Sequence, residues 1–248
     1  MSDGVVPPVA REPQPAWFSS TWGLGDVAFG IALSQALAVV ATVVVFAIAG
    51  WESGADVPLW AGALLQVPLW GGWLAAVFLA GRNKGHGVAD DFGWSFRTSD
   101  VPLGLLIGVV MQVVVLPILY LPLLRLLGST PEELSAPAKE LTSKAEGTVG
   151  WIVLALIVVV GAPIVEELFY RGLFLRALRK RGIPDVWSCV ISGAVFGAMH
   201  FQPLQFAGLF VLGTVLALLA VRTGRLGLSI VTHMAFNATT VALLYSQR

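Results

Sequence analysis

Residues 149–176 read VGWIVLALIVVVGAPIVEELFYRGLFLR, and this stretch decides the fold. Its first part, up to Val165, contains no charged side chain. A helix needs about 20 mostly apolar residues to cross the hydrocarbon core of a bilayer. We therefore expect a transmembrane helix here, one that carries Glu166, Glu167 and Arg171 within its span.

Further apolar windows lie on both sides of this stretch and are separated by short polar segments. They are residues 27–49, 58–80, 101–124, 185–201, 204–221 and 226–245. Each is long enough for a membrane-crossing helix, although 185–201 and 204–221 are divided only by the stretch around Gln202–Gln205. The sequence thus predicts an all-α, polytopic transmembrane bundle of about seven helices, with an eighth crossing or a re-entrant piece left open.

The composition supports a membrane protein and excludes other classes. Hydrophobic residues make up 56% of the 248 residues and charged residues 12%, whereas a soluble domain carries about 25% charged residues. Fifteen basic and fifteen acidic residues give no net charge, so no overall field favours nucleic-acid binding. The one cysteine, Cys189, excludes an intramolecular disulfide and argues against a cysteine-based metal site.

The N-terminal segment differs from the rest of the chain. Residues 1–22 hold four prolines and scattered charge, without the basic start and apolar stretch of a signal peptide. We expect a disordered cytoplasmic tail there, followed by a single membrane-embedded domain over 23–248.

Lys and Arg in the loops predict the orientation, because cytoplasmic loops are enriched in these residues. With the N-terminus inside, ten basic residues fall in cytoplasmic segments: Arg11, Arg82, Lys84, Arg97, Arg176, Arg179, Lys180, Arg181, Arg222 and Arg225. Four fall outside: Arg125, Lys139, Lys144 and Arg248. We therefore expect a multi-pass protein of the cell membrane with a cytoplasmic N-terminus.

Acidic and aromatic residues near the ends of the windows have structural explanations. Asp26, Asp56, Asp100 and Asp185 stand where helices begin, and an acid there accepts a bond from a free N–H of the first turn. Tryptophans near span ends suit the headgroup level: Trp17, Trp22, Trp51, Trp60, Trp94 and Trp151. The polar loop 125–148 is either a short amphipathic surface helix or a linker.

Few ionisable groups lie inside the windows, and each is costly there. Residues four apart share a helix face, so Glu167 reaches Arg171 and His233 stacks with Asn237. Glu166, about 100° round the helix, is left as a carboxylate without an obvious partner and is a candidate general base. At 1.5 Å per residue these groups meet in the cytoplasmic half of the membrane, while His200 comes out somewhat deeper.

Three motifs in this order, each within an apolar window, carry a resemblance. They are Glu-Glu-x-x-x-Arg at 166–171, Phe-x-x-x-His at 196–200 and His-x-x-x-Asn at 233–237. Together they resemble the signature of the CPBP intramembrane protease family, also called the Abi or CAAX-protease family, whose eukaryotic members trim prenylated proteins. The resemblance implies a catalytic core over about 149–245.

The resemblance also implies roles for these residues. Glu166 and His200 would activate a water for attack on a peptide bond. His233 and Asn237 would hold the oxyanion that forms at the carbonyl. Glu167 and Arg171 would be a supporting ion pair. The substrate would be a membrane-embedded or lipidated protein cut near the cytoplasmic face.

Three alternatives stay open. Glu166, Glu167, His200 and His233 could in principle bind zinc, because carboxylate and imidazole are both acceptable ligands; we expect no metal, since none of them lies in a His-Glu-x-x-His helix. A non-hydrolytic binding or bacteriocin-immunity protein of the same fold would retain the motifs without catalysis. Buried Glu and His also mark proton-coupled transporters, although the chain lacks a second symmetric set of helices.

Overall fold

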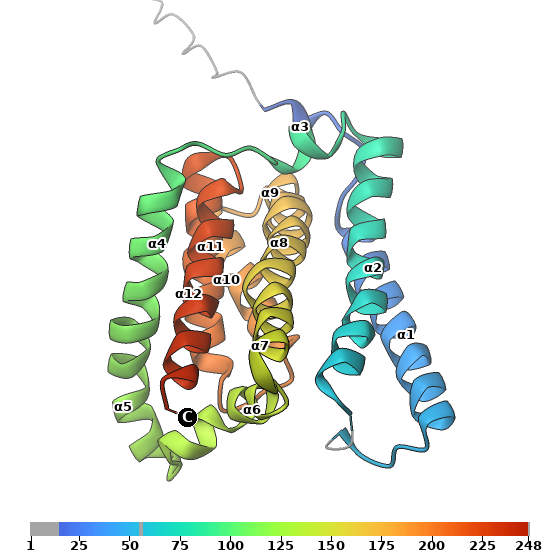
Figure 1. Cartoon of the computed structure of the whole chain (residues 1–248). Helices are drawn as coiled ribbons and strands as arrows, with labels where there is room; N and C mark the ends of the chain where they lie inside the picture. Colours follow the sequence, from blue (N-terminus) through green and yellow to red (C-terminus); the bar gives the residue numbers. More distant parts are fainter. Residues whose placement is uncertain (1–14, 55–56, 248) are drawn as a thin grey trace, which may run out of the picture.

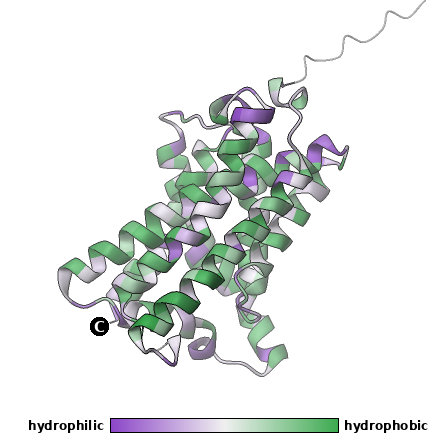
Figure 2. Ribbon diagram, turned by 90° about the vertical axis from the view of Figure 1, so that its right-hand side faces the viewer, coloured by the Kyte–Doolittle hydropathy of each residue, from purple (hydrophilic) through white to green (hydrophobic). Residues whose placement is uncertain are grey.

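The computed structural model describes residues 15–54 and 57–247, and every regular element in them is helical. Six helices are long and apolar enough to cross a membrane: α1 (Leu24–Ala49), α2 (Leu59–Lys84), α4 to α5 (Asp100–Leu127), α7 to α9 (Gly147–Lys180), α11 (Phe206–Thr223) and α12 (Gly227–Tyr245). Hydrophobic residues line most of their length (Figure 2). The chain is thus an all-α, multi-pass membrane protein, as the sequence predicted.

The helices run up and down between two ends of the molecule (Figure 1). At one end, which we call the basic end, lie the short helix α3 (Val88–Phe92), the end of α9 and the start of α12. The opposite end holds α6 (Pro131–Ser143) and the last turn of α12, and we call it the α6 end. The polar loop that the sequence left as helix or linker therefore contains a helix, which begins with a capping box between Thr130 and Glu133.

One expected span is shorter than its window. Helix α10 runs over Asp185–Ala198, so it is only about 21 Å long at 1.5 Å per residue and does not match the roughly 30 Å hydrocarbon core. It starts at the basic end and stops inside the bundle, and a loop with Phe201 at φ 53° leads into α11. The window 185–201 is therefore a partial crossing that places His200 within the protein.

Two spans are interrupted by π-helical turns that precede a proline. Leu116 N–H bonds to Met111 O and Ala162 N–H to Ile157 O, five residues back in each case. The prolines that follow, Pro117 and Pro163, have no N–H to continue the ladder. Each turn thus leaves a carbonyl inside the membrane span without a backbone donor.

Acidic residues at helix starts have structural roles, but not the predicted one, because none of the described ones accepts a hydrogen bond from an N–H of the first turn of its helix. The Asp26 carboxylate accepts from Gly23 N at 3.0 Å and pairs with Lys84 Nζ at 2.6 Å. Asp100 accepts from the backbone N–H of Arg97 and pairs with Arg225. Asp185 begins α10 and pairs with Arg179, while Asp56, like Arg11 and Arg248, lies outside the described residues.

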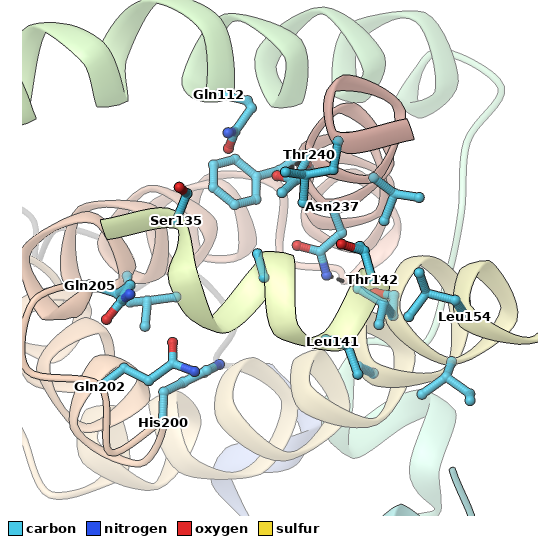
Figure 3. A pocket seen from close by; sticks show the side chains of 18 of the residues that line it. Gln112, Ser135, Leu141, Thr142, Leu154, His200, Gln202, Gln205, Asn237 and Thr240 are labelled. Atoms are coloured by element: carbon cyan, nitrogen blue, oxygen red, sulfur yellow. Dashed lines mark hydrogen bonds between the residues drawn. The ribbon is translucent and has the colours of Figure 1, made fainter. Parts of the chain in front are cut away.

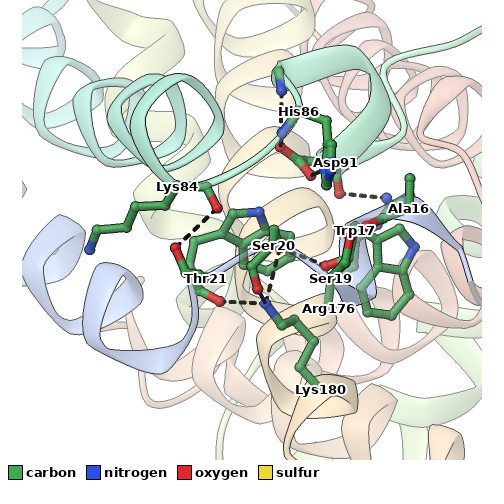
Figure 4. Close-up of polar contacts among 12 residues, drawn as sticks. Ala16, Trp17, Ser19, Ser20, Thr21, Lys84, His86, Asp91, Arg176 and Lys180 are labelled. Atoms are coloured by element: carbon green, nitrogen blue, oxygen red, sulfur yellow. Dashed lines mark hydrogen bonds and ion pairs between the residues drawn. The ribbon is translucent and has the colours of Figure 1, made fainter.

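Residues 15–22 are ordered, against the expectation of a tail through residue 22. Trp17 and Trp22 are 5% and 1% exposed, so they are core residues rather than interfacial anchors. Lys180 Nζ donates to the carbonyls of Ser20 and Trp22, each at 2.7 Å (Figure 4). Its ammonium also lies 4.3 Å from the centre of the Trp22 ring, and such cation–π contacts stabilise the docked segment. Residues 1–14 lie outside the described part, and the single-domain division stays a prediction.

Glycines allow helices to approach closely where a Cβ would collide. A Cβ at Gly72 would meet the backbone of Ser34 and would force α1 away from α2. A Cβ at Gly193 would lie 2.7 Å from Thr214 N, between α10 and α11. Small residues at helix interfaces are typical of membrane bundles, where close packing replaces the hydrophobic driving force.

Gly72→Ala is expected to destabilise the protein by about 1–3 kcal/mol, the usual cost of overpacking a filled interface. Gly71→Ala is the matched control, because a Cβ at Gly71 meets nothing within 4 Å. Thermal unfolding of the two variants in the same detergent measures the difference. Equal unfolding temperatures would show that α1 and α2 do not pack as described.

Candidate active site

Glu167 and Arg171 form a buried ion pair on one face of the helix that runs from α7 to α9. Arg171 Nη1 lies 2.8 Å from Glu167 Oε1, and both side chains are fully buried. Arg171 Nη2 donates to the carbonyl of Gly213 in α11 at 2.9 Å. The pair therefore links two transmembrane helices, as expected from the spacing of four residues.

His233 stands between the two glutamates of the first motif. Its Nδ1 lies 3.0 Å from Glu167 Oε1, and its Nε2 lies 3.8 Å from Glu166 Oε2. Since an ionised carboxylate only accepts, Nδ1 carries the proton that points to Glu167. His233 and Glu166 are thus neighbours, although the resemblance implied His200 as the partner of Glu166.

Phe196 connects the second motif to the other two. Its ring lies 4.5 Å from the Arg171 guanidinium carbon, 4.7 Å from the His200 ring and 5.7 Å from the His233 ring. His200 Nδ1 lies 2.7 Å from the carbonyl of Phe196. A carbonyl only accepts, so Nδ1 carries a proton and the neutral ring presents Nε2 as an acceptor.

Asn237 satisfies a carbonyl that the irregular helix leaves free. Its Nδ2 donates to Val158 O at 2.8 Å. Within the π-helical turn Leu156–Gly161, the next donor to Val158 O would be Pro163, which has no N–H. One amide hydrogen of Asn237 is used in this way, and the other remains available.

The three motifs meet at one cavity of about 670 Å³, which is lined by Glu166, His200, His233 and Asn237. Figure 3 shows His200 and Asn237 on its wall. Glu167 and Arg171 do not line it, so they lie behind Glu166 and His233 rather than on the cavity wall. Most of the remaining wall is apolar, contributed by α2, α5, α6, α7 and α12. The arrangement places a carboxylate, two imidazoles and an amide around a space large enough for a peptide segment.

The same residues do not assemble a metal site. Within residues 15–54 and 57–247, no group of three or more His, Cys, Asp or Glu side chains is placed to hold a metal ion. The zinc set that the sequence left open, Glu166, Glu167, His200 and His233, is therefore not brought together as one set of ligands.

Residues 148–239, which include all three motifs, match a known family: type II CAAX prenyl endopeptidase Rce1-like. This part of the chain is an Rce1-like domain. The Rce1-like (CPBP) domain thus covers the helices that line the cavity from α7 to α12, while α1 to α6 lie outside the match.

One curated relative is similar to part of this chain. It is an Escherichia coli protein named "Uncharacterized 24.3 kDa protein", 32% identical over 119 residues, which are 45% of this chain and 54% of that protein. The chain thus matches only about half the length of that relative. No solved structure matches the chain.

Several residues that shape the Rce1-like site were not singled out from the sequence. Tyr120 OH donates to Leu204 O at 3.2 Å and accepts from Gly208 N at 2.8 Å, which holds the loop that follows His200. The Val158 carbonyl is another example. Two features of the sequence could have indicated this free carbonyl. Pro163 lies within an apolar window and has no N–H to donate, and Asn237 is a polar residue within a later apolar window.

Proposed function

We propose that this protein is an intramembrane endopeptidase that hydrolyses a peptide bond of a membrane-associated protein. The observation that carries the proposal is that Glu166, His200, His233 and Asn237, from three separate helical regions, line one cavity in the membrane-spanning part of the molecule. Membership of the Rce1-like family over residues 148–239 supports the same class of reaction.

In this mechanism Glu166 and His200 activate a water molecule. Glu166 has no hydrogen-bond partner within the described chain and is 3.8 Å from His233, so its carboxylate is available to take a proton. The neutral His200 ring accepts through Nε2 because Nδ1 is held by Phe196 O. The water loses its proton to this pair while its oxygen attacks the carbonyl carbon.

His233 and Asn237 then face the oxygen that becomes negative in the tetrahedral intermediate. Asn237 offers its second amide hydrogen, and His233, whose Nδ1 stays on Glu167, donates through Nε2 when that nitrogen carries a proton. A donor of this kind contributes about 3 kcal/mol in soluble enzymes. The C–N bond breaks when the proton moves from Glu166 to the departing amine.

The ion pair of Glu167 and Arg171 is a positioning element in this proposal. Glu167 Oε1 accepts from both Arg171 and His233. The arginine neutralises the carboxylate, and the carboxylate fixes the orientation and tautomer of the imidazole. The substrate class that the family suggests is a prenylated or otherwise lipid-anchored protein.

The experiment compares new protein N-termini in membranes of cells that express wild type, Glu166→Gln or Glu146→Gln at matched levels. Glu146 precedes α7 and makes no capping hydrogen bond, which makes it a matched carboxylate control. A protease gives termini that vanish with Glu166→Gln and remain with Glu146→Gln. Identical termini in all three samples, with folded proteins, would favour the binding or bacteriocin-immunity function.

Chelation of metals is expected to leave the cleavage rate unchanged within about twofold, because the described residues offer no assembled ligand set. Membranes treated with 1,10-phenanthroline, and then with added zinc, provide the measurement. A zinc protease in the same membranes confirms that the chelator works. A loss of cleavage that zinc restores would contradict the metal-free mechanism.

A further inference from the structure

A backbone carbonyl in the α4–α5 span has lost its donor to a proline and has gained no other. In the α7–α9 span, Pro163 leaves Val158 O free, and Asn237 Nδ2 donates to it at 2.8 Å. In the α4–α5 span a π-helical turn is followed by Pro117. The next donor to Gln112 O would be the N–H that Pro117 lacks, and no side chain of the described residues donates to this oxygen. The same irregularity thus occurs in both spans, but only the Val158 carbonyl is paired.

The unpaired carbonyl faces the cavity. A helical carbonyl points along the axis toward the residues four and five positions later. For Gln112 these are Leu116 and Pro117, and both line the cavity. The Gln112 side chain lines it too, without a hydrogen-bond partner among residues 15–54 and 57–247. Figure 3 shows this side chain pointing inward, on the side opposite His200.

Close packing between α4 and α12 fixes the level of Gln112 along the membrane span. The two helices begin at the basic end and run in the same direction (Figure 1). A Cβ at Gly108 would lie 2.7 Å from Phe236 N, and Met111 belongs to the same hydrophobic cluster as Phe236. Gln112 is one turn beyond Gly108, and Asn237 directly follows Phe236. Gln112 therefore lies within about one helical turn of the level of Asn237.

The groups that Gln112 presents match a peptide backbone. Polar groups without a partner are costly away from water, and here a backbone oxygen and a side-chain amide of one residue face the same space. The carbonyl accepts from an N–H, whereas the side-chain amide can donate to a carbonyl and accept from an N–H. An extended peptide offers N–H and C=O groups in alternation. A backbone segment can thus satisfy both groups of Gln112 at once.

We propose that Gln112 is a substrate-binding residue, which holds the main chain of the substrate next to the cleaved bond through its side-chain amide and its backbone carbonyl. This inference rests on the proposed function and identifies how the same cavity positions its peptide. Because the contacts are made to the backbone, they do not depend on the side chains of the substrate. Glu166 and Asn237 then act on a carbonyl that is already held at their level.

The test measures binding without cleavage, in purified Glu166→Gln protein in one detergent. The probe is an acetylated decapeptide of alternating alanine and leucine with a fluorescein label, because the cavity wall is mostly apolar and its formally charged lining residues are Glu166 and Lys144. A second probe is the depsipeptide of the same side chains, in which oxygen replaces each backbone N–H. Fluorescence anisotropy gives the Kd of each probe with and without Gln112→Met.

Gln112→Met is expected to raise the Kd of the peptide at least about threefold, the usual net effect of a lost hydrogen bond. The Kd of the depsipeptide should change less than about twofold, since its backbone has no N–H for the amide oxygen to accept. Methionine has nearly the shape of glutamine, so the unfolding temperature should not fall. An unchanged Kd for the peptide, an equal change for both probes, a lower unfolding temperature, or no binding of the peptide would overturn the proposal.

Pro117→Ala tests the carbonyl, because alanine restores an N–H that can donate to Gln112 O. Pro122→Ala is the matched control, since Pro122 lies inside α5, is exposed and does not line the cavity. Pro117→Ala should raise the Kd of the peptide at least about threefold, whereas Pro122→Ala should leave it unchanged. Equal values for the two variants would refute the role of the carbonyl. None of these readouts requires proteolysis, so their failure is distinguishable from failure of the proposed activity.

Discussion

Glu166→Gln is expected to lower the rate of cleavage by at least about 100-fold while the protein stays folded, because general-base catalysis contributes about 10²–10⁴-fold. Glutamine has nearly the same shape as glutamate but cannot take a proton from water. The substitution removes no hydrogen bond within the described residues, and His233 Nε2 lies 3.8 Å from the carboxylate. The rate of product accumulation in membranes with equal amounts of protein measures the effect.

Two further variants distinguish a loss of the chemical step from a loss of folded protein. His200→Ala is expected to reduce cleavage to a similar degree, since its ring lines the same cavity, whereas Glu146→Gln retains the wild-type rate. Thermal unfolding of each purified variant shows whether the fold is intact. Near-full activity in Glu166→Gln or His200→Ala would refute the proposed activation of water.

Arg171→Met is expected to lower the free energy of unfolding by about 3–5 kcal/mol, the usual cost of leaving a buried charge without its partner. Glu167 is fully buried, and only His233 would remain beside its carboxylate. Glu167→Gln should also be destabilising, because the buried Arg171 would lose its carboxylate partner and keep the carbonyl of Gly213 and the Phe196 ring. Both variants act on cleavage through the position of His233 and through the amount of folded protein.

The control for this prediction breaks an exposed ion pair. The Lys84 side chain is 49% exposed in its pair with Asp26, so Lys84→Met should cost no more than about 1 kcal/mol. Thermal unfolding in one detergent compares the three variants. If Glu167→Gln is as stable as wild type yet inactive, its carboxylate takes part in the reaction and its role as a support is wrong.

Much of the fold could be predicted from hydropathy, because helix length and apolar content are nearly sufficient to identify a span. The pair of Glu167 and Arg171 was also predictable, since a spacing of four places both on one face, and the contact is kept although Glu167–Phe174 is π-helical. The length of the apolar window 185–201 predicted a full membrane crossing, and this prediction was wrong. The window includes the loop that follows Ala198, so helix α10 is shorter than the window. Hydropathy does not distinguish a helix that crosses the membrane from one that stops inside the protein.

The details of the site depend on contacts between helices, and the spacing of residues along the sequence does not predict such contacts. The proximity of His233 to Glu166 follows from how α12 packs against α8 (Ala162–Glu166). Trp17 and Trp22 resembled interfacial anchors, but the basic side chains of α9 provide cation–π partners that bury them.

The most direct test of the central claim uses purified protein in proteoliposomes with one substrate identified from the comparison of N-termini. Cleavage in H₂¹⁸O should place one ¹⁸O atom in the new carboxylate with the wild-type protein, and no fragment should form with Glu166→Gln. Cleavage at an undiminished rate by Glu166→Gln, or no cleavage by pure wild-type protein in the presence of that substrate, would contradict hydrolysis by a Glu166-activated water in this chain.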